Sequence, residues 1–228
     1  MGSEMCIRDR ACFGLEFGGE NLLFDPFITP NEKAKDININ EIKADYILLT
    51  HGHQDHIADA EVIAKNNDAV IVSGFETSVF FGNRGCKYHP MNHGGKWKFD
   101  FGTVKLVNAV HSSSFPDGSY GGNPHGFVIW NDEGCFYHAG DTALTMDMKL
   151  IPMTCPKLNF AILPIGDNFT MGHEDAAIAA EFIECDNIVG CHYDTFGYIV
   201  IDKGAATASF SKRGKTIKLP EIGETFEV

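Results

Sequence analysis

The sequence predicts an α/β fold in which two β-sheets pack together and are covered by helices. Short apolar runs of the kind that form buried strands, such as residues 46–49 and 158–163, alternate with segments that have helical spacing. In other segments apolar and polar residues alternate on either side of glycine, which is typical of antiparallel strand pairs. Strand-rich halves with interspersed helices suit two covered sheets.

Individual elements follow from these patterns. Antiparallel pairs are predicted for residues 13–17 with 22–24, 97–101 with 104–110, and 127–130 with 135–138. Further strands are predicted at 46–49, 69–72, 158–163 and 188–191, and helices at 57–65 and 174–183. The segment from Ser112 to Pro124 is rich in Ser, Gly and Pro, so we expect a loop, and its length suggests the rim of a site.

Length and composition favour one domain. The chain has 228 residues, and no repeat or linker divides it, so residues 11–228 are predicted to form a single domain. Residues 1–10 show no apolar period and lead into a strand pattern without a turn signal. They are predicted to be a non-native leader and are set aside from the fold.

Charge and cysteine usage exclude several classes of protein. The net charge of −13 disfavours a nucleic-acid partner and leaves a small-molecule substrate. Seven scattered cysteines predict reduced thiols. No apolar run is long enough for a membrane helix, so we expect no membrane partner and a cytoplasmic location. A homo-oligomer is compatible with the sequence.

The strongest functional signal is a histidine-rich segment directly after a predicted buried strand. Three imidazoles and one carboxylate fall within six residues of the run Thr50-His51-Gly52-His53-Gln54-Asp55-His56. Such density is rarely the accident of a polar surface loop. Alternate residues such as His51 and His53 can converge on one ion, while Asp55 and His56 turn toward a neighbouring one. Imidazole and carboxylate ligands suit zinc, iron or manganese.

This His-x-His-x-Asp-His pattern resembles the signature of the metallo-β-lactamase superfamily, and later segments continue the resemblance. Phe24-Asp25-Pro26-Phe27 and residues 164–172 are similar to short metal-dependent hydrolases related to ascorbate-phosphate lactonases. The resemblance implies a four-layer αββα sandwich with mixed sheets and with metals at the sheet edge. One departure is Arg10, which stands where relatives usually carry a pocket histidine.

The resemblance also implies a set of seven metal ligands. One ion would be held by His51, His53 and His111, the other by Asp55, His56 and His192, and both would share Asp141. Taken alone, His111, Asp141 and His192 would each more often be structural, but their order and their places after apolar strands favour ligation. Two divalent ions are expected, zinc or manganese, with iron also accepted.

Such a centre predicts a hydrolase in which a metal-bridging hydroxide attacks an ester-like bond, in a lactone or a phosphoester of a small metabolite. By the same resemblance we expect Asp55 and Asp141 to be the catalytic carboxylates. Asp55 either takes a proton from the attacking water or acts as a ligand alone, and both roles stay open. The alternatives are a non-hydrolytic metal-binding protein and an iron oxidoreductase that uses the same ligands.

Five further residues are candidates for contacts with the ligands or the substrate, each with an ordinary structural explanation beside it. His138 would orient a ligand or be a satisfied core histidine. His173 would face the pocket or cap a helix. Asp25 would hold a ligand histidine or form a turn. Asn168 and Thr195 would contact the substrate or be ordinary polar loop residues. The five are Asp25, His138, Asn168, His173 and Thr195.

Overall fold

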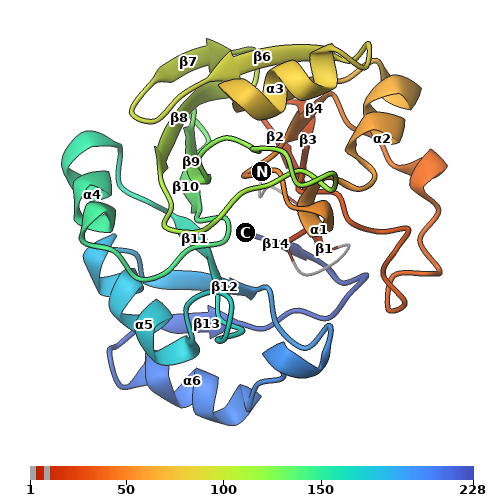
Figure 1. Ribbon diagram of the computed structural model, residues 1–228. Helices are drawn as coiled ribbons and strands as arrows, with labels where there is room; N and C mark the ends of the chain where they lie inside the picture. The colour runs from red at the N-terminus through yellow and green to blue at the C-terminus, as the bar shows by residue number, and fades with distance from the viewer. Residues whose placement is uncertain (1–3, 8–10) are drawn as a thin grey trace. The chain divides into compact units, whose positions relative to one another are not determined.

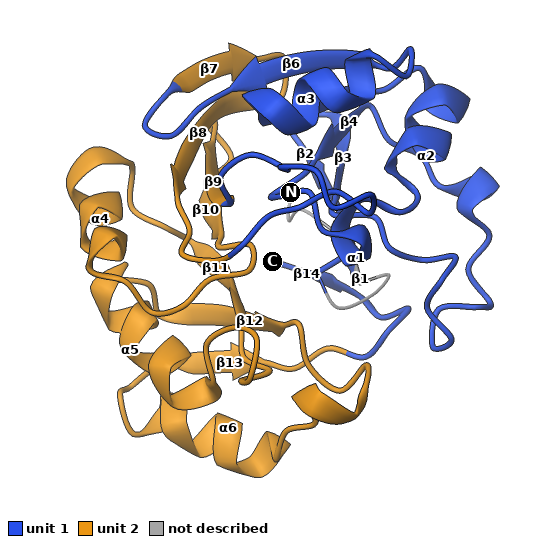
Figure 2. Ribbon diagram, viewed as in Figure 1, with its two compact units in different colours: residues 1–95, 112–124, 221–228 blue, residues 96–111, 125–220 orange. Residues whose placement is uncertain are grey.

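The structure is a computed structural model that describes residues 4–7 and 11–228. These residues form two compact units, shown in different colours in Figure 2. Unit 1 contains Met1–Gly95, Ser112–Pro124 and Glu221–Val228, and unit 2 contains Lys96–His111 and His125–Pro220. Each unit is built on one seven-stranded mixed sheet with helices, so the predicted combination of mixed sheets and helices is present in both.

In unit 1 the strand order is β14-β1-β2-β3-β4-β5-β6 (Figure 1). The pairs from β14 to β3 are antiparallel, and those from β3 to β6 are parallel. The strands are β1 (Glu4–Ile7), β2 (Phe13–Phe17), β3 (Glu20–Phe24), β4 (Tyr46–Leu48), β5 (Val70–Gly74), β6 (Lys87–Met91) and β14 (Thr225–Glu227). The helices are η1 (Ile39–Glu41), α1 (Gln54–Ile57), α2 (Ala60–Asn67) and α3 (Phe75–Gly82).

The core of unit 1 follows from strand register. Leu23, Ile47 and Ile71 occupy matched positions on β3, β4 and β5 and therefore share one face of the sheet. They belong to one buried cluster with Ile63 of α2, so this face is covered by the helix. The adjacent strand positions point to the opposite face, and they too are apolar, as in Leu48, because a parallel strand of this kind is buried on both sides.

The predicted helix at 57–65 is two helices in the structure, and the break has a physical cause. Asp59 lies between α1 and α2, and its carboxylate accepts hydrogen bonds from the backbone N–H groups of Ile28 at 2.6 Å and Thr29 at 2.9 Å. These bonds fix the chain after β3 to the turn between the helices. The His51–His56 loop and α1 are thereby held next to the end of β3.

In unit 2 the strand order is β13-β12-β11-β10-β9-β8-β7, antiparallel from β7 to β10 and parallel from β10 to β13. The strands are β7 (Lys96–Phe99), β8 (Gly102–Asn108), β9 (His125–Trp130), β10 (Cys135–His138), β11 (Phe160–Pro164), β12 (Asn187–Cys191) and β13 (Thr216–Lys218). The helical segments are η2 (Met146–Lys149), α4 (Leu150–Thr154), α5 (His173–Phe182), η3 (Gly197–Ile199) and α6 (Lys203–Ser211).

Helix α5 covers the parallel part of this sheet with small side chains. Ala176, Ala177 and Ala180 are fully buried in one cluster with Leu163 of β11 and Ile188 of β12. Alanine allows the helix backbone to approach the sheet closely and has the highest helix propensity, so α5 combines packing with local preference.

Several elements were not predicted. Strand β1 pairs with β2 and β14, although residues 1–10 had been set aside as a leader, and a non-native origin for them stays a prediction. The predicted single domain also stays a prediction.

Helix α3 has no apolar period because its buried face is partly polar. There Thr77 donates to the Gly121 carbonyl at 2.9 Å and Ser78 to the Ser73 carbonyl at 3.1 Å.

Among residues 4–7 and 11–228, no helix has both the length and the apolar character needed to cross a bilayer. All seven cysteines lie in this described part, and none of them forms a disulfide there. Burial raises the pKa of Cys135 to about 12 and also raises the pKa of Cys185. These two thiols are therefore protonated at neutral pH and are poor nucleophiles.

We predict that iodoacetamide at pH 8 alkylates the half-buried Cys6 and Cys155 at least about tenfold faster than Cys135 and Cys185, because the thiolate is the reactive form. Peptide mass spectrometry over a time course measures the rates. The same reaction in denaturant is the control, and there all seven sites should react alike. Equal native rates for Cys135 and Cys155 would contradict the burial described here.

Candidate metal centre

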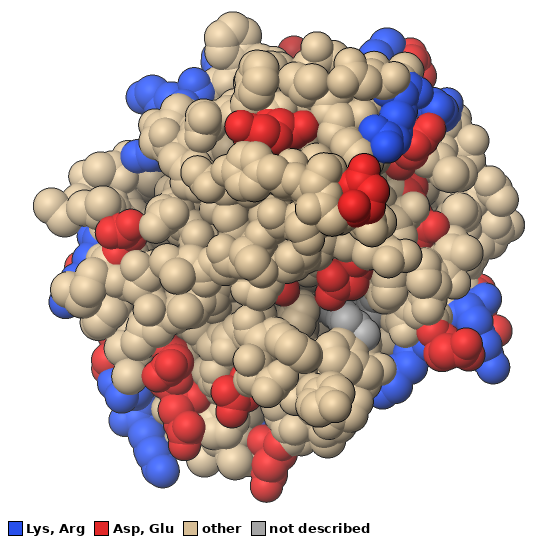
Figure 3. All heavy atoms as spheres, in the orientation of Figure 1, with Lys and Arg blue, Asp and Glu red and all other residues tan. Residues whose placement is uncertain are grey.

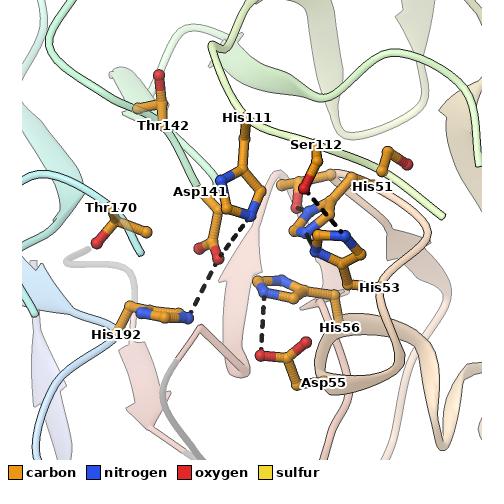
Figure 4. Close-up of polar contacts among 12 residues, drawn as sticks. His51, His53, Asp55, His56, His111, Ser112, Asp141, Thr142, Thr170 and His192 are labelled. Atoms are coloured by element: carbon orange, nitrogen blue, oxygen red, sulfur yellow. Dashed lines mark hydrogen bonds and ion pairs between the residues drawn. The ribbon is translucent and has the colours of Figure 1, made fainter. Parts of the chain in front are cut away.

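The first half of the candidate centre lies in unit 1, in the loop that follows β4 and in the short helix α1. His51 and His56 are fully buried, and their ring centroids are 4.1 Å apart. His51 Nε2 and His53 Nδ1 face each other at 2.9 Å (Figure 4). Asp55 Oδ2 lies 3.9 Å from His56 Nε2 (Figure 4). The four donors that the sequence pattern predicts are therefore gathered in one short segment, two in the loop after β4 and two in α1.

Asp25 holds this loop at the end of β3. Its buried carboxylate accepts hydrogen bonds from the Thr50 backbone N–H at 2.8 Å and from the Thr50 hydroxyl at 2.7 Å, and it contacts His56 Nδ1 at 2.9 Å. Asp25 also has a positive φ of 43°, so it forms a tight turn at the same time. Both contacts considered for Asp25 from the sequence, the one with His56 and the turn, are therefore present, while its role at a metal site stays a prediction.

These contacts set the tautomers of two imidazoles. Because a carboxylate only accepts, His56 Nδ1 carries the proton toward Asp25, which leaves the lone pair on Nε2. The Thr50 hydroxyl donates to Asp25 and therefore accepts from His51 Nδ1 at 3.0 Å, which leaves the lone pair of His51 on Nε2 as well. In both rings Nε2 is thus the nitrogen that could bind a cation, and an orienting carboxylate of this kind is common behind metal-bound histidine.

The loop Ser112–Pro124 packs against the same segment of unit 1. Ser113 Oγ accepts from the Gly52 backbone N–H at 3.0 Å, and Ser112 Oγ lies 3.4 Å from His53 Nε2. A Cβ atom at Gly52 would lie 3.1 Å from the Cα atom of Gly121 and 3.2 Å from the Phe115 ring, so only glycine fits there without a shift. The predicted loop is present, and its first residues border the histidines.

The second half of the candidate centre lies in unit 2, at the ends of separate strands. His111 follows β8, Asp141 follows β10 and His192 follows β12. Asp141 Oδ2 lies 3.1 Å from His192 Nε2 and 3.7 Å from His111 Nε2 (Figure 4). Asp141 and His192 are almost fully buried. One carboxylate oxygen and two imidazole nitrogens thus converge inside unit 2.

Thr142, which sequence reasoning did not single out, fixes the backbone of this half. Its Oγ1 accepts from the Val110 backbone N–H at 3.0 Å, and its carbonyl accepts from the Met171 backbone N–H at 3.0 Å. The residue after Asp141 is therefore tied to the residue before His111. In the sequence, only its position next to a predicted ligand could have indicated this role. Thr50 is likewise the direct neighbour of a predicted ligand, His51.

The donor chemistry of both halves fits a divalent cation. Each half offers only imidazole nitrogens and carboxylate oxygens, the set that suits zinc, manganese or iron. The buried position of most donors also favours a bound cation, because a buried carboxylate without compensating charge is costly. All seven predicted ligands belong to one half or the other, four in unit 1 and three in unit 2.

The remaining candidate residues have varied surroundings. His173 begins α5, and its Nδ1 lies 2.9 Å from Ser209 Oγ of α6, a contact that joins the two helices. His138 is fully buried at the end of β10. Asn168, with a φ of 52°, and Thr195 lie in loops after β11 and β12. Site roles for these four residues stay predictions, and Arg10 lies outside the described residues.

Comparison with known proteins identifies the family. The model of the beta-lactamase superfamily domain matches residues 4–192. This chain belongs to that superfamily. A relative from Christiangramia forsetii named UPF0173 metal-dependent hydrolase is 62% identical over 94% of this chain and 95% of its own length. One with the same name from Flavobacterium johnsoniae is 59% identical over 96% of this chain and 97% of its own length.

A solved structure gives the same result for the fold. Igni18, described as a novel metallo hydrolase from the hyperthermophilic archaeon Ignicoccus hospitalis, aligns over 100% of both chains with a TM-score of 0.89 and 31% identity. The predicted fold class, an α/β fold of the metallo-β-lactamase type with mixed sheets, is confirmed. The matched residues 4–192 of this superfamily member include all seven predicted ligands, of which His192 is the last.

We predict that Asp25→Asn lowers the affinity of the protein for zinc by about 10- to 100-fold, because the amide can no longer accept from both His56 and Thr50. Competition with a chromogenic chelator measures the affinity. Asp45→Asn is the matched control, since Asp45 also receives two hydrogen bonds in unit 1, both from Asn21. Similar zinc affinities for the two variants would show that Asp25 does not orient a ligand.

Proposed function

We propose that this superfamily member is a hydrolase that holds two divalent metal ions and cleaves an ester-like bond, in a lactone or a phosphoester of a small metabolite. The observation that carries the proposal is the convergence of Asp141 Oδ2 with His111 Nε2 and His192 Nε2 in unit 2, together with the oriented imidazoles of unit 1. The names of the relatives, metal-dependent hydrolases, support it.

The proposed ligand assignment follows the pattern of the superfamily. His51, His53 and His111 hold one ion, Asp55, His56 and His192 hold the other, and Asp141 is shared. Zinc or manganese is the expected metal. The fixed tautomers of His51 and His56 support the assignment, because each leaves an Nε2 lone pair for a cation.

Two bound cations would polarise the carbonyl or phosphoryl oxygen of the substrate and lower the pKa of a water molecule toward neutrality. The protein supplies the orientation of the groups around them. The Asp25 carboxylate keeps the proton of His56 on Nδ1, and Thr50 does the same for His51. The side chain of Asp55 is 32% exposed and can therefore take a proton from the attacking water.

A small substrate is more compatible with the surface than a nucleic acid. The net charge is −13, and on the face shown in Figure 3 Lys and Arg side chains lie in separate groups with Asp and Glu among them. Binding of a phosphate backbone needs a continuous basic surface. We therefore expect neither a nucleic acid nor a membrane as a partner. A cytoplasmic location and a homo-oligomer are both compatible with this function.

We predict two equivalents of zinc or manganese per chain by mass spectrometry of the reconstituted protein, and hydrolysis of members of a panel of lactones, phosphodiesters and thioesters. Asp141→Asn should lower kcat/KM by about a hundredfold or more, because the shared carboxylate is lost. Asp147→Asn is the control, since this exposed carboxylate of unit 2 binds Asn108 instead.

Other outcomes identify the alternatives. Bound iron with redox turnover and no hydrolysis would favour an oxidoreductase that uses the same ligands. Metal binding with no reaction on the whole panel would favour a non-hydrolytic metal-binding protein. A hydrolase whose rate is unchanged in Asp141→Asn would contradict the proposed centre.

A further inference from the structure

Unit 2 carries three aromatic rings close together on its surface. The ring centroid of Phe169 lies 5.9 Å from that of Phe196 and 6.2 Å from that of Tyr198. The ring centroids of Phe196 and Tyr198 are 6.4 Å apart. Phe169 is 48% exposed and Tyr198 is 75% exposed. Exposed aromatic rings that lie this close together offer an apolar surface to a ligand. We call Phe169, Phe196 and Tyr198 the aromatic cluster.

The loop that carries Phe169 lies against the backbone at Thr142, the neighbour of Asp141, and at His192. Its ends are joined by a β-bridge between Gly166 and Gly172, and the Met171 backbone N–H donates to the carbonyl of Thr142, the neighbour of Asp141. A Cβ atom at Gly166 would lie 2.1 Å from the His192 carbonyl oxygen, so the loop passes directly over the backbone of His192. Figure 4 shows Thr170 of this loop beside Asp141 and His192.

The segment that carries the other two rings begins at His192 itself. His192 and Asp194 both have positive φ values, 56° and 58°, which turn the chain sharply after β12. The turn is closed because Asp194 N–H donates to the Ile199 carbonyl at 2.8 Å and Asp194 Oδ1 accepts from the Ile201 N–H at 3.0 Å. Phe196 and Tyr198 lie within this closed turn. Two of the three rings of the aromatic cluster are therefore held by the segment that begins at the candidate ligand His192.

The charges in these loops disfavour an anionic occupant. Residues 166–172 and 194–201 contain two aspartates, Asp167 and Asp194, and no Lys or Arg. Asp194 is paired with Lys203 of α6 at 3.9 Å, and Asp167 Oδ1 accepts from the Asn168 N–H at 2.8 Å. Neither loop offers a basic side chain to a phosphate, whereas aromatic faces bind alkyl and aryl groups through apolar contact and stacking.

We propose that the aromatic cluster binds an uncharged aryl or extended alkyl group of the substrate, next to the ester-like bond that is cleaved. This inference rests on the proposed hydrolase function and narrows its substrate class to ester-like compounds that carry such an apolar group. Phe169 and Tyr198 act as specificity residues, and the exposure of their rings in the free protein is what the substrate group reduces on binding.

The test compares γ-lactones that share one ring and differ in their substituent. For the metal-loaded protein, kcat/KM for the benzyl-substituted lactone should exceed that for the unsubstituted lactone by about tenfold or more, the effect of burying part of one ring. In the Phe169→Ala/Tyr198→Ala double variant this ratio should fall toward one. Trp97→Ala is the control, because Trp97 is 55% exposed on β7, at the other end of the strand order from β12.

A wild-type ratio near one, or an unchanged ratio in the double variant, overturns the inference while the hydrolase function stands. If no lactone is hydrolysed, the proposed function fails for lactones. A measurement of lactone binding then tests the inference about the aromatic cluster separately. The protein labelled with fluorotyrosine has six tyrosines, and Tyr198→Phe assigns the resonance of Tyr198. A saturable shift of that resonance with the benzyl lactone, and none with the unsubstituted lactone, supports the inference, and the absence of a shift overturns it.

A second copy of this chain is the rival occupant of the aromatic cluster. Sedimentation of the wild type and the double variant at equal concentration distinguishes the two. A smaller oligomer for the double variant would assign the rings to self-association and overturn the inference. An unchanged oligomeric state, together with a reduced lactone ratio, supports substrate binding.

Discussion

Buried charge must be compensated, and this constraint organises both halves of the candidate centre. In unit 1 the carboxylate of Asp25 is fully buried and is satisfied by Thr50 and His56. In unit 2 the buried carboxylate of Asp141 is approached by His111 and His192. The first arrangement orients imidazoles, and the second gathers donors around one oxygen. Each arrangement therefore fits a bound cation, whose charge would compensate the buried carboxylate.

The positions of these side chains follow from where the strands end. The apolar side chains of β4, β8, β10 and β12 are buried, so the polar residues that follow these strands emerge at the boundary of the core. This is why the order of motifs along the chain predicted the ligand candidates as well as the fold class. Local sequence was sufficient for the β2–β3 hairpin and for α5, because period and turn residues agree there.

Other features depend on contacts that no local pattern contains. Helix α3 buries Thr77 and Ser78 against backbone carbonyls 44 and 5 residues away in the chain, so its polar inner face hid it from a search for apolar period. The division between α1 and α2 comes from the bonds of Asp59 to Ile28 and Thr29, about 30 residues away. The aromatic cluster was missed for the same reason, since Phe169 and Tyr198 meet only when the loops after β11 and β12 fold together.

Joint binding of two cations by both halves is tested most directly by anomalous diffraction from crystals of the metal-loaded protein, recorded at the absorption edge of the metal. We expect two anomalous peaks, one bonded to His51, His53 and His111 and one bonded to Asp55, His56 and His192, with Asp141 bonded to both. A metal bound by the residues of one unit alone, or density that leaves His111, Asp141 and His192 without metal, would contradict the proposed centre.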